Sequence, residues 1–367
     1  MQFTRTLPRE LVHRAAVAEV FLTDAQRHSE DEVLLAAQLP RLHAFYDDTL
    51  GPRTHHDPLL LLEACRQGIF VVAHRYFDVP LGHKFLLRAV EFEVPDPSAL
   101  ARGDTPTETV VAARVENRFR GRTGVTGLRL GFTVRTGARE ALLARIDYRW
   151  MPPEDWRRLR DGQRGSLGLP HTPVALLGPR VEPTLVGRRD PANTAISPPR
   201  TSRDGARVAR LVADTGHPIL YDHWVDHVPA MLELEALRQL ALSASLATDS
   251  RVTPTPMPIG LAARFRCFAE MDLPLQCRMA PAPPGTDAEC TVHQLGTLVT
   301  DARIRLADRS TAVPPDAFAE RRTAERRTAE RRSAERRSAE RRTSRDSPES
   351  GATGTPQQRT RAGGAPS

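Results

Sequence analysis

His227-Val228-Pro229-Ala230-Met231-Leu232-Glu233-Leu234-Glu235-Ala236-Leu237-Arg238-Gln239 is the stretch of this 367-residue chain that decides its fold. Its pattern, a histidine followed after seven residues by Glu-Ala-x-Arg-Gln, also occurs from His55 to Gln67, 172 positions earlier (227 − 55 = 172). Both copies open an apolar stretch of helical length, Leu59 to Ala73 and Met231 to Leu246. A motif repeated once at so long an offset indicates a duplicated domain rather than a solenoid.

Each expected helix carries three polar side chains in apolar surroundings. They are Glu63, Arg66 and Gln67 on the first helix and Glu235, Arg238 and Gln239 on the second. Residues three and four positions apart share a helix face, and a helix that is apolar nearly all round is buried. Buried charges are costly unless they satisfy one another or bind a ligand. One interpretation is therefore a structural ion pair in each core, and the other is a site at a pseudo-twofold interface, which the duplication favours.

The elements around the helices repeat as well. Asp57-Pro58 is a good helix start, with Asp at the N-cap and Pro at the first helical position. Pro258-Ile259-Gly260 matches Pro80-Leu81-Gly82, which predicts a post-helix loop six residues longer in the second half. The predicted strands of the first half are Val17–Leu22, Val33–Leu39, Phe85–Val94, Thr109–Arg120, Val125–Thr136 and Glu140–Trp150. Those of the second half are Val181–Val186, Val208–Ala213, Leu261–Ala269, Leu275–Ala280, Cys290–Gly296 and Thr297–Leu306.

A long apolar helix followed by antiparallel strands indicates a curved sheet wrapped around that helix. This is the hotdog architecture, and the duplication predicts an α+β double hotdog that forms an internal pseudodimer. We expect a first repeat at 1–155, a linker at 156–179 with a short helix at Glu154–Arg160, and a second repeat at 180–310.

Residues 311–367 are a low-complexity Arg/Glu-rich tail with five Ala-Glu-Arg-Arg-Thr/Ser units from Ala319 to Thr343. A five-residue period forms no apolar stripe, so we expect disorder or a fluctuating helix, with no partner indicated. From Ala319 onward the chain has 13 Arg and 7 acidic residues, so +6 of the net charge of +7 belongs to the tail. A nearly neutral body is not expected to bind nucleic acid.

Several classes of chemistry lack their motifs. The chain has no dinucleotide-binding G-x-G-x-x-G, no Walker loop, no G-x-S-x-G and no H-E-x-x-H. The four cysteines form no C-x-x-C pair, so we expect no metal and no cofactor. No stretch approaches roughly 18 uninterrupted apolar residues, and the N-terminus has no signal-like apolar region. We therefore expect a cytoplasmic protein that does not bind membranes.

The two motif stretches resemble the signature of the A-factor biosynthesis hotdog-repeat family. The resemblance rests on His56 to Gln67 and Asp226 to Gln239, together with Glu19 to Asp24 and Val79 to Leu87, and it spans roughly residues 10 to 310. Members of this family make γ-butyrolactone or furan-type signalling molecules in actinomycetes. The resemblance implies transfer of a β-ketoacyl group from acyl carrier protein to a hydroxyl of dihydroxyacetone phosphate, with Glu63, Glu235 and Arg238 as the catalytic residues.

The residues themselves agree with this chemistry. A buried carboxylate with a raised pKa can act as a base for the hydroxyl, with Glu235 favoured over Glu63. Arginine suits a phosphate because of its bidentate fork, and we assign that role to Arg238. Arg66, Gln67, His227 and Gln239 are expected to bind substrate, and the apolar helix faces to line a tunnel for the acyl chain.

Two alternatives stay open. The first is a hotdog β-hydroxyacyl thioester dehydratase or thioesterase, since Pro229, Glu235 and Gln239 also resemble the dehydratase helix motif, although a small residue is usual where Arg238 stands. The second is a non-catalytic acyl-binding regulatory module. An assay of a β-ketoacyl carrier-protein thioester with and without dihydroxyacetone phosphate separates all three functions.

Overall fold

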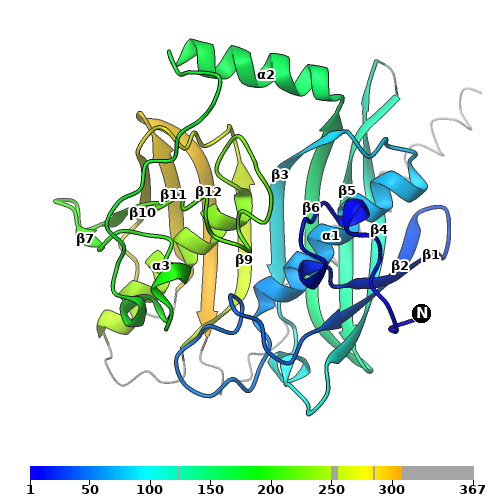
Figure 1. The fold of residues 1–367 in the computed structure, drawn as a ribbon. Helices are drawn as coiled ribbons and strands as arrows, with labels where there is room; N and C mark the ends of the chain where they lie inside the picture. Colours follow the sequence, from blue (N-terminus) through cyan, green and yellow to red (C-terminus); the bar gives the residue numbers. More distant parts are fainter. Residues whose placement is uncertain (123, 249–254, 284–285, 308–367) are drawn as a thin grey trace, which may run out of the picture. The chain divides into compact units, whose positions relative to one another are not determined.

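The protein is described from a computed structural model, which covers residues 1–122, 124–248, 255–283 and 286–307. The tail expected at 311–367 lies outside these residues. The dominant element is one twelve-stranded antiparallel sheet in the order β1-β2-β4-β5-β6-β3-β9-β12-β11-β10-β8-β7 (Figure 1). Six neighbouring strands come from each half of the chain, so the sheet is two hotdog sheets joined edge to edge.

The strands and helices have the following bounds. In the first half the strands are β1 Leu22–Arg27, β2 Glu32–Leu39, β3 Lys84–Glu93, β4 Thr107–Gly121, β5 Gly124–Thr136 and β6 Arg139–Met151. In the second half they are β7 Arg200–Thr201, β8 Arg207–Arg210, β9 Met257–Phe265, β10 Leu275–Met279, β11 Ala288–Gln294 and β12 Thr297–Ala307. The α-helices are α1 Pro58–Tyr76, α2 Pro153–Ser166 and α3 Ala230–Thr248, and short 3-10 turns are η1 Arg9–Val12, η2 Val17–Glu19, η3 Pro97–Leu100, η4 Pro183–Val186 and η5 Pro191–Asn193.

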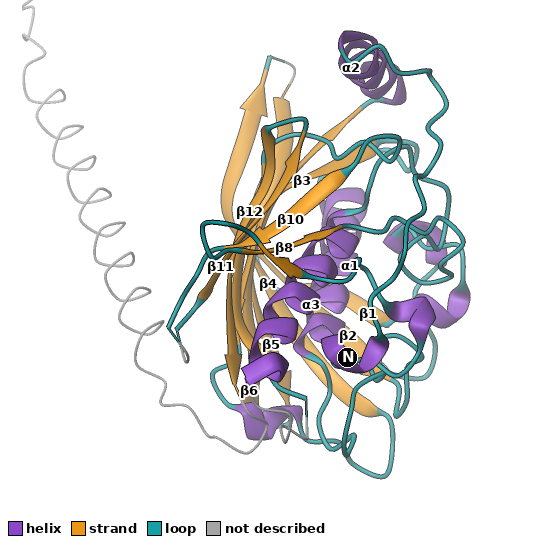
Figure 2. Cartoon of the chain, turned by 90° about the vertical axis from the view of Figure 1, so that its left-hand side faces the viewer, coloured by secondary structure: helices purple, strands orange, loops and turns teal. Residues whose placement is uncertain are grey.

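The two long helices lie on the same face of the sheet (Figure 2). Helix α1 begins as predicted, because the Asp57 side chain accepts a hydrogen bond from the Leu59 N–H and Pro58 occupies the first turn. Between Pro58 and Ala73 every residue except Arg66 is buried, since the sheet covers one side of the helix and the N-terminal segments cover the other. The apolar helix therefore forms the core of its repeat.

The halves meet where β3 pairs with β9. Val90 lies opposite Ala263 and Glu91 opposite Ala262, so the pseudo-twofold axis passes through this strand pair. The double hotdog predicted from the duplicated helix is confirmed. Among the described residues, no helix is long and apolar enough to cross a membrane.

Some predicted elements are wrong in detail. The run Val17–Leu22 was predicted as a strand but forms η2 and the start of β1, and Val181–Val186 contains η4. Both runs are apolar because they cover a helix, and a short apolar run does not reveal its backbone conformation. The six-residue loop insertion is also wrong, because Pro258 to Gly260 lies inside β9. The expected short linker helix is present as the longer helix α2.

Candidate functional site

The polar residues of helix α1 form a closed ion cluster around Glu63. Arg66 donates to Glu63 through Nε (2.6 Å) and Nη2 (2.9 Å). Arg14, which precedes the first strand, donates through Nη2 (2.6 Å) and Nε (3.2 Å), and Gln67 adds an amide at 3.1 Å. The buried carboxylate is therefore satisfied by three side chains, two of which are charged.

Helix α3 carries the same cluster around Glu235. Arg188 donates through Nη2 (2.7 Å) and Nε (3.1 Å), and the Gln239 amide donates at 2.5 Å. Arg238 Nη2 lies 2.7 Å from Glu235 Oε2. Arg188 thus has the place in the second repeat that Arg14 has in the first.

The Glu63 carboxylate is ionised in this setting. Burial alone would raise its pKa, but Arg14 and Arg66 outweigh burial and lower the pKa to about 2. A base at this position would need a raised pKa, and Glu63 does not have one, because its arginine partners are already in place. A carboxylate with so low a pKa and so many donors is a weak base, so its evident action is to hold the guanidinium groups.

The two glutamines connect the helices to the segments that cover them. Gln67 donates to the Glu19 carbonyl (2.7 Å) and accepts from the Phe21 N–H (2.9 Å). Gln239 makes the equivalent bonds to the Asn193 carbonyl (2.8 Å) and the Ala195 N–H (2.8 Å). The structure places both amides in the core, and their substrate-binding role stays a prediction.

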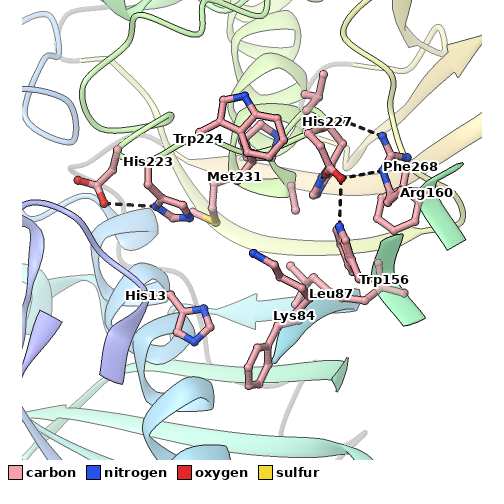
Figure 3. Close-up of a pocket in the computed structure, with 18 of the residues that line it drawn as sticks. His13, Lys84, Leu87, Trp156, Arg160, His223, Trp224, His227, Met231 and Phe268 are labelled. Carbon is pink, nitrogen blue, oxygen red and sulfur yellow. Dashed lines mark hydrogen bonds and ion pairs between the residues drawn. The ribbon is translucent and has the colours of Figure 1, made fainter. Parts of the chain in front are cut away.

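One large cavity of about 810 Å³ opens beside the first cluster (Figure 3). Arg14 and Arg66 line it from the first repeat, and the segment Asp222 to Met231 lines it from the second. Much of the remaining wall is apolar, contributed by Ile69, Phe70, Phe85, Leu87, Phe265 and Phe268. The cavity therefore lies between the repeats, with polar groups from both halves and an apolar wall suited to an acyl chain.

Within the described part of the chain, the void beside the second cluster is far smaller. The void beside Arg238 measures about 10 Å³. Arg238 there pairs with Asp57, the N-cap residue of α1, as well as with Glu235. At the helix offset of 172 the counterpart of Asp57 is Pro229, which supplies no carboxylate to Arg66. The Arg66 side chain is accordingly 18% exposed, against 5% for Arg238. The catalytic roles expected of Glu235 and Arg238 stay predictions, and the geometry gives these residues little room for a substrate.

Positive charge gathers at one part of the cavity wall. The pKa of His13 is lowered to about 3 by burial and by the neighbouring His74, Arg66, His223 and Lys84. Lys84 is the only lysine in the chain, and its ammonium group extends into the cavity (Figure 3). Arg66 and Lys84 are the cations among these neighbours that line the cavity, so this part of the wall is suited to an anion.

A histidine–carboxylate pair lies on the cavity wall contributed by the second repeat. His227 Nδ1 is 2.7 Å from Asp226 Oδ1. Asp226 Oδ2 also accepts from Trp156 Nε1 (3.0 Å) and Arg160 Nε (3.2 Å), both on helix α2 (Figure 3). The predicted substrate-binding residue His227 therefore lies in the cavity.

Glu233 is one of the carboxyl groups that line this cavity, and it differs from Glu63 of the neighbouring ion cluster. It is buried, it accepts a hydrogen bond from Thr300, and burial raises its pKa to about 8. Its counterpart in the first repeat is Leu61. At neutral pH the carboxyl group of Glu233 is therefore protonated in a large fraction of the protein molecules.

Sequence reasoning missed several of these residues. Arg14 and Arg188 lie far from their partners in the chain, and they fall at an offset of 174 rather than 172. Two features of the sequence could have indicated further site residues. Lys84 is the only lysine, and the carboxylate of Asp226 directly precedes His227. No group of three His, Cys, Asp or Glu side chains that could hold a metal ion occurs in the part of the chain that the structure describes.

The model of the A-factor biosynthesis hotdog domain matches residues 1–152 and 174–307. The chain belongs to the A-factor biosynthesis hotdog family. A relative from Streptomyces virginiae, named 2-oxo-3-(phosphooxy)propyl 3-oxoalkanoate synthase, is 32% identical over 294 residues, which cover 80% of this chain and 93% of that protein. A relative of the same name from Streptomyces coelicolor is 32% identical over 298 residues, covering 80% and 89%. Among solved structures, an acyl-ACP thioesterase from Bacteroides thetaiotaomicron aligns with 76% of this chain and all of its own, at 13% identity and a TM-score of 0.44.

Proposed function

We propose that this member of the A-factor biosynthesis hotdog family is a 2-oxo-3-(phosphooxy)propyl 3-oxoalkanoate synthase. It transfers a 3-oxoacyl group from acyl carrier protein to a hydroxyl of dihydroxyacetone phosphate. The hydroxyl oxygen forms an ester bond to the thioester carbon, the C–S bond breaks, and the hydroxyl proton ends on the carrier thiol. The observation that supports this proposal is the large cavity of about 810 Å³, which combines an apolar wall with the cations Arg66 and Lys84.

The cations supply a site for the phosphate. Arg66 uses Nε and Nη2 to bind Glu63, so Nη1 is the nitrogen that it offers to a ligand. Lys84 adds a flexible point charge from β3. Arg14 is tied to Glu63 and to the Ile219 carbonyl (3.0 Å), which makes the wall rigid. In our proposal Arg66 takes the phosphate-binding role that the sequence analysis gave to Arg238, and Glu63 positions it.

The same geometry supports one working site per chain. The first repeat contributes the cations and the second contributes His227, so the site needs both halves. We retain the proposed division into repeats at 1–155 and 180–310 with a linker between them. Helix α2 begins at the end of the first repeat, and its Trp156 and Arg160 bind Asp226 of the second.

The test is acyl transfer by the purified full chain. A 3-oxoacyl carrier-protein thioester is incubated with and without dihydroxyacetone phosphate, and free thiol and phosphorylated ester are both measured. We expect ester only in the presence of the acceptor. Thiol release that does not depend on the acceptor, or formation of an unsaturated thioester from a 3-hydroxyacyl carrier protein, would refute the proposal in favour of a thioesterase or dehydratase.

Variants locate the phosphate site. Arg66→Ala and Lys84→Ala each remove one charge-assisted contact worth roughly 1.5–3 kcal/mol, so the KM for dihydroxyacetone phosphate should rise about 10-fold to 150-fold. Arg303→Ala is the matched control, because Arg303 is a half-exposed arginine on β12 that pairs with Glu289. An unchanged KM in both cavity variants would place the phosphate elsewhere.

A further inference from the structure

We propose that Asp226 and His227 form the general-base pair of the acyl transfer, and that helix α2 holds this pair in position. The inference rests on the proposed function, because it names the group that removes the proton from the acceptor hydroxyl. It is carried by the contacts of the pair and by its place in the cavity.

The hydrogen bonds determine which nitrogen of His227 is available. A carboxylate only accepts hydrogen bonds, so Nδ1 of His227 carries the proton that it shares with Asp226 Oδ1 at 2.7 Å. In the neutral ring Nε2 then has the free lone pair. The His227 side chain is 22% exposed, so substrate can reach it. A histidine oriented by a partly buried carboxylate is the arrangement that proton abstraction from a hydroxyl needs.

The carboxylate of Asp226 stays ionised although it is largely buried. Burial raises its pKa, but the hydrogen bonds from His227 and Trp156 and the charge of Arg160 outweigh burial and lower the pKa well below the usual range. An ionised Asp226 stabilises the imidazolium that forms when His227 takes up a proton.

Helix α2 fixes the pair from outside the hotdog repeats. Arg160 donates to the Asp226 side chain (3.2 Å) and to its backbone carbonyl (2.8 Å), and it binds Glu270 in a bidentate pair (2.6 and 2.8 Å). The rings of Trp156 and Phe268 lie 5.7 and 5.1 Å from the His227 ring. The imidazole is therefore held on its sides as well as at Nδ1.

The first repeat has a different residue at the position of the carboxylate. At the offset of 172, His55 corresponds to His227 and Thr54 to Asp226. His55 Nδ1 lies 2.8 Å from the Thr54 hydroxyl, which carries no charge to stabilise an imidazolium. The duplication therefore supplies a matched position at which the same substitution can be made without touching the proposed pair.

Other titratable groups in or beside the cavity are less suited to removing the proton from the acceptor hydroxyl. Glu63 is occupied by Arg14, Arg66 and Gln67. His13 Nε2 lies 2.8 Å from His74 Nε2, whose ring bonds to the Val79 carbonyl, so Nε2 of His13 is engaged in a donor bond. Glu233 lies deep against β12, where its carboxyl bonds to Thr300.

The proton balance closes within the pair. His227 Nε2 accepts the hydroxyl proton as the oxygen attacks the thioester carbonyl carbon. The tetrahedral intermediate collapses with cleavage of the C–S bond, and the imidazolium returns the proton to the departing thiolate. No oxidant, reductant or further reactant is consumed.

The experiment compares His227→Ala, Asp226→Asn and the matched control His55→Ala in the full chain. We expect His227→Ala to lower kcat by about 10²–10⁴ with little change in the KM for dihydroxyacetone phosphate, and added imidazole to restore part of the rate. His55→Ala should keep the kcat of the wild type. Asp226→Asn should lower kcat and move the acidic limb of the pH–rate profile to lower pH, because the imidazolium loses its counter-charge.

The outcomes separate the two proposals. If the wild-type chain makes no acceptor-dependent ester, the proposed function fails. If it does, and a folded His227→Ala variant keeps its kcat or shows only a higher KM, the base assignment is overturned while the function stands. A comparable loss in Glu233→Gln with His227→Ala unaffected would overturn the assignment in favour of Glu233. An Asp226→Asn variant with reduced kcat and an unmoved pH profile would reduce the carboxylate to a structural role.

Discussion

Glu233→Gln should remove a pH dependence of stability that the buried carboxyl imposes on the fold. The glutamine keeps the hydrogen bond from Thr300 but cannot ionise. In the folded protein burial raises the pKa of Glu233 from 4.5 to about 8. Between these values the folded chain retains a proton that the unfolded chain has lost, so the free energy of unfolding falls as the pH rises. Stability is fully present below pH 4.5 and is lost as the pH rises through about 8.

The size of the effect follows from proton linkage. One proton of difference is worth about 1.4 kcal/mol per pH unit. From pH 6 to pH 8, allowing for partial ionisation of the folded carboxyl near its own pKa, the wild type should lose about 2 kcal/mol that the variant keeps.

The assay is urea denaturation of both proteins at pH 6 and pH 8, with the free energy of unfolding extrapolated to water. Histidines titrate in this range too, but they are the same in both proteins and cancel in the comparison. If the wild type and the variant show parallel pH dependences, the carboxyl is not buried in a neutral form and the reasoning is refuted.

Four further substitutions test the packing of the helices. Arg238→Ala removes the cation shared by two buried carboxylates, so it should cost about 3–5 kcal/mol in unfolding free energy by chemical denaturation; a change below about 1 kcal/mol would contradict the pairing. Glu63→Gln should lower the free energy of unfolding at pH 7, and the difference from the wild type should shrink as acid protonates the wild-type carboxylate. The variant should also raise the KM for the acceptor more than it lowers kcat. A loss of about 10²–10⁴ in kcat alone would instead restore Glu63 as the base. Gly68→Ala places a Cβ 2.7 Å from Leu35 Cδ1, so it should destabilise the fold by about 1 kcal/mol despite the better helix propensity of alanine. The added Cβ of Gly162→Ala on α2 meets nothing within 4 Å, so this variant should be slightly more stable than the wild type. The melting temperatures of both variants test these expectations.

The sequence was enough to predict which side chains of one helix cluster together, because their spacing along the helix is a local property. The positions of Glu63 and Arg66 in one cluster follow from their spacing of three. The arginine that completes each cluster, Arg14 or Arg188, comes from a segment whose backbone has no regular pattern, so no periodicity reveals it. The strand wrongly predicted at Val17–Leu22 is such a segment, since its apolar residues cover α1 and only its last residue, Leu22, joins the sheet.

The difference between the two halves was harder to foresee. Whether an arginine lines a cavity or is closed off depends on one residue from the opposite repeat. Asp57 pairs with Arg238, and the matching position in the second repeat is Pro229, which has no carboxylate. An alignment of the two repeats shows that Pro229 replaces Asp57, but only the packing of the halves shows that Asp57 pairs with Arg238. The preference for Glu235 and Arg238 rested on the fuller motif of the second copy, and motif completeness says nothing about access.

Each half also anchors the other through matched contacts. Arg14 donates to the Ile219 carbonyl, 205 residues away, and Arg188 donates to the Phe45 carbonyl, 143 residues away. During synthesis the first half leaves the ribosome long before its partner exists, with the Glu63 ion cluster unsupported on that side. We therefore expect slow maturation dominated by contacts between distant segments, and a first half that is prone to aggregation when expressed alone. Co-expression of the two halves as separate chains should restore the folded protein that neither half yields by itself.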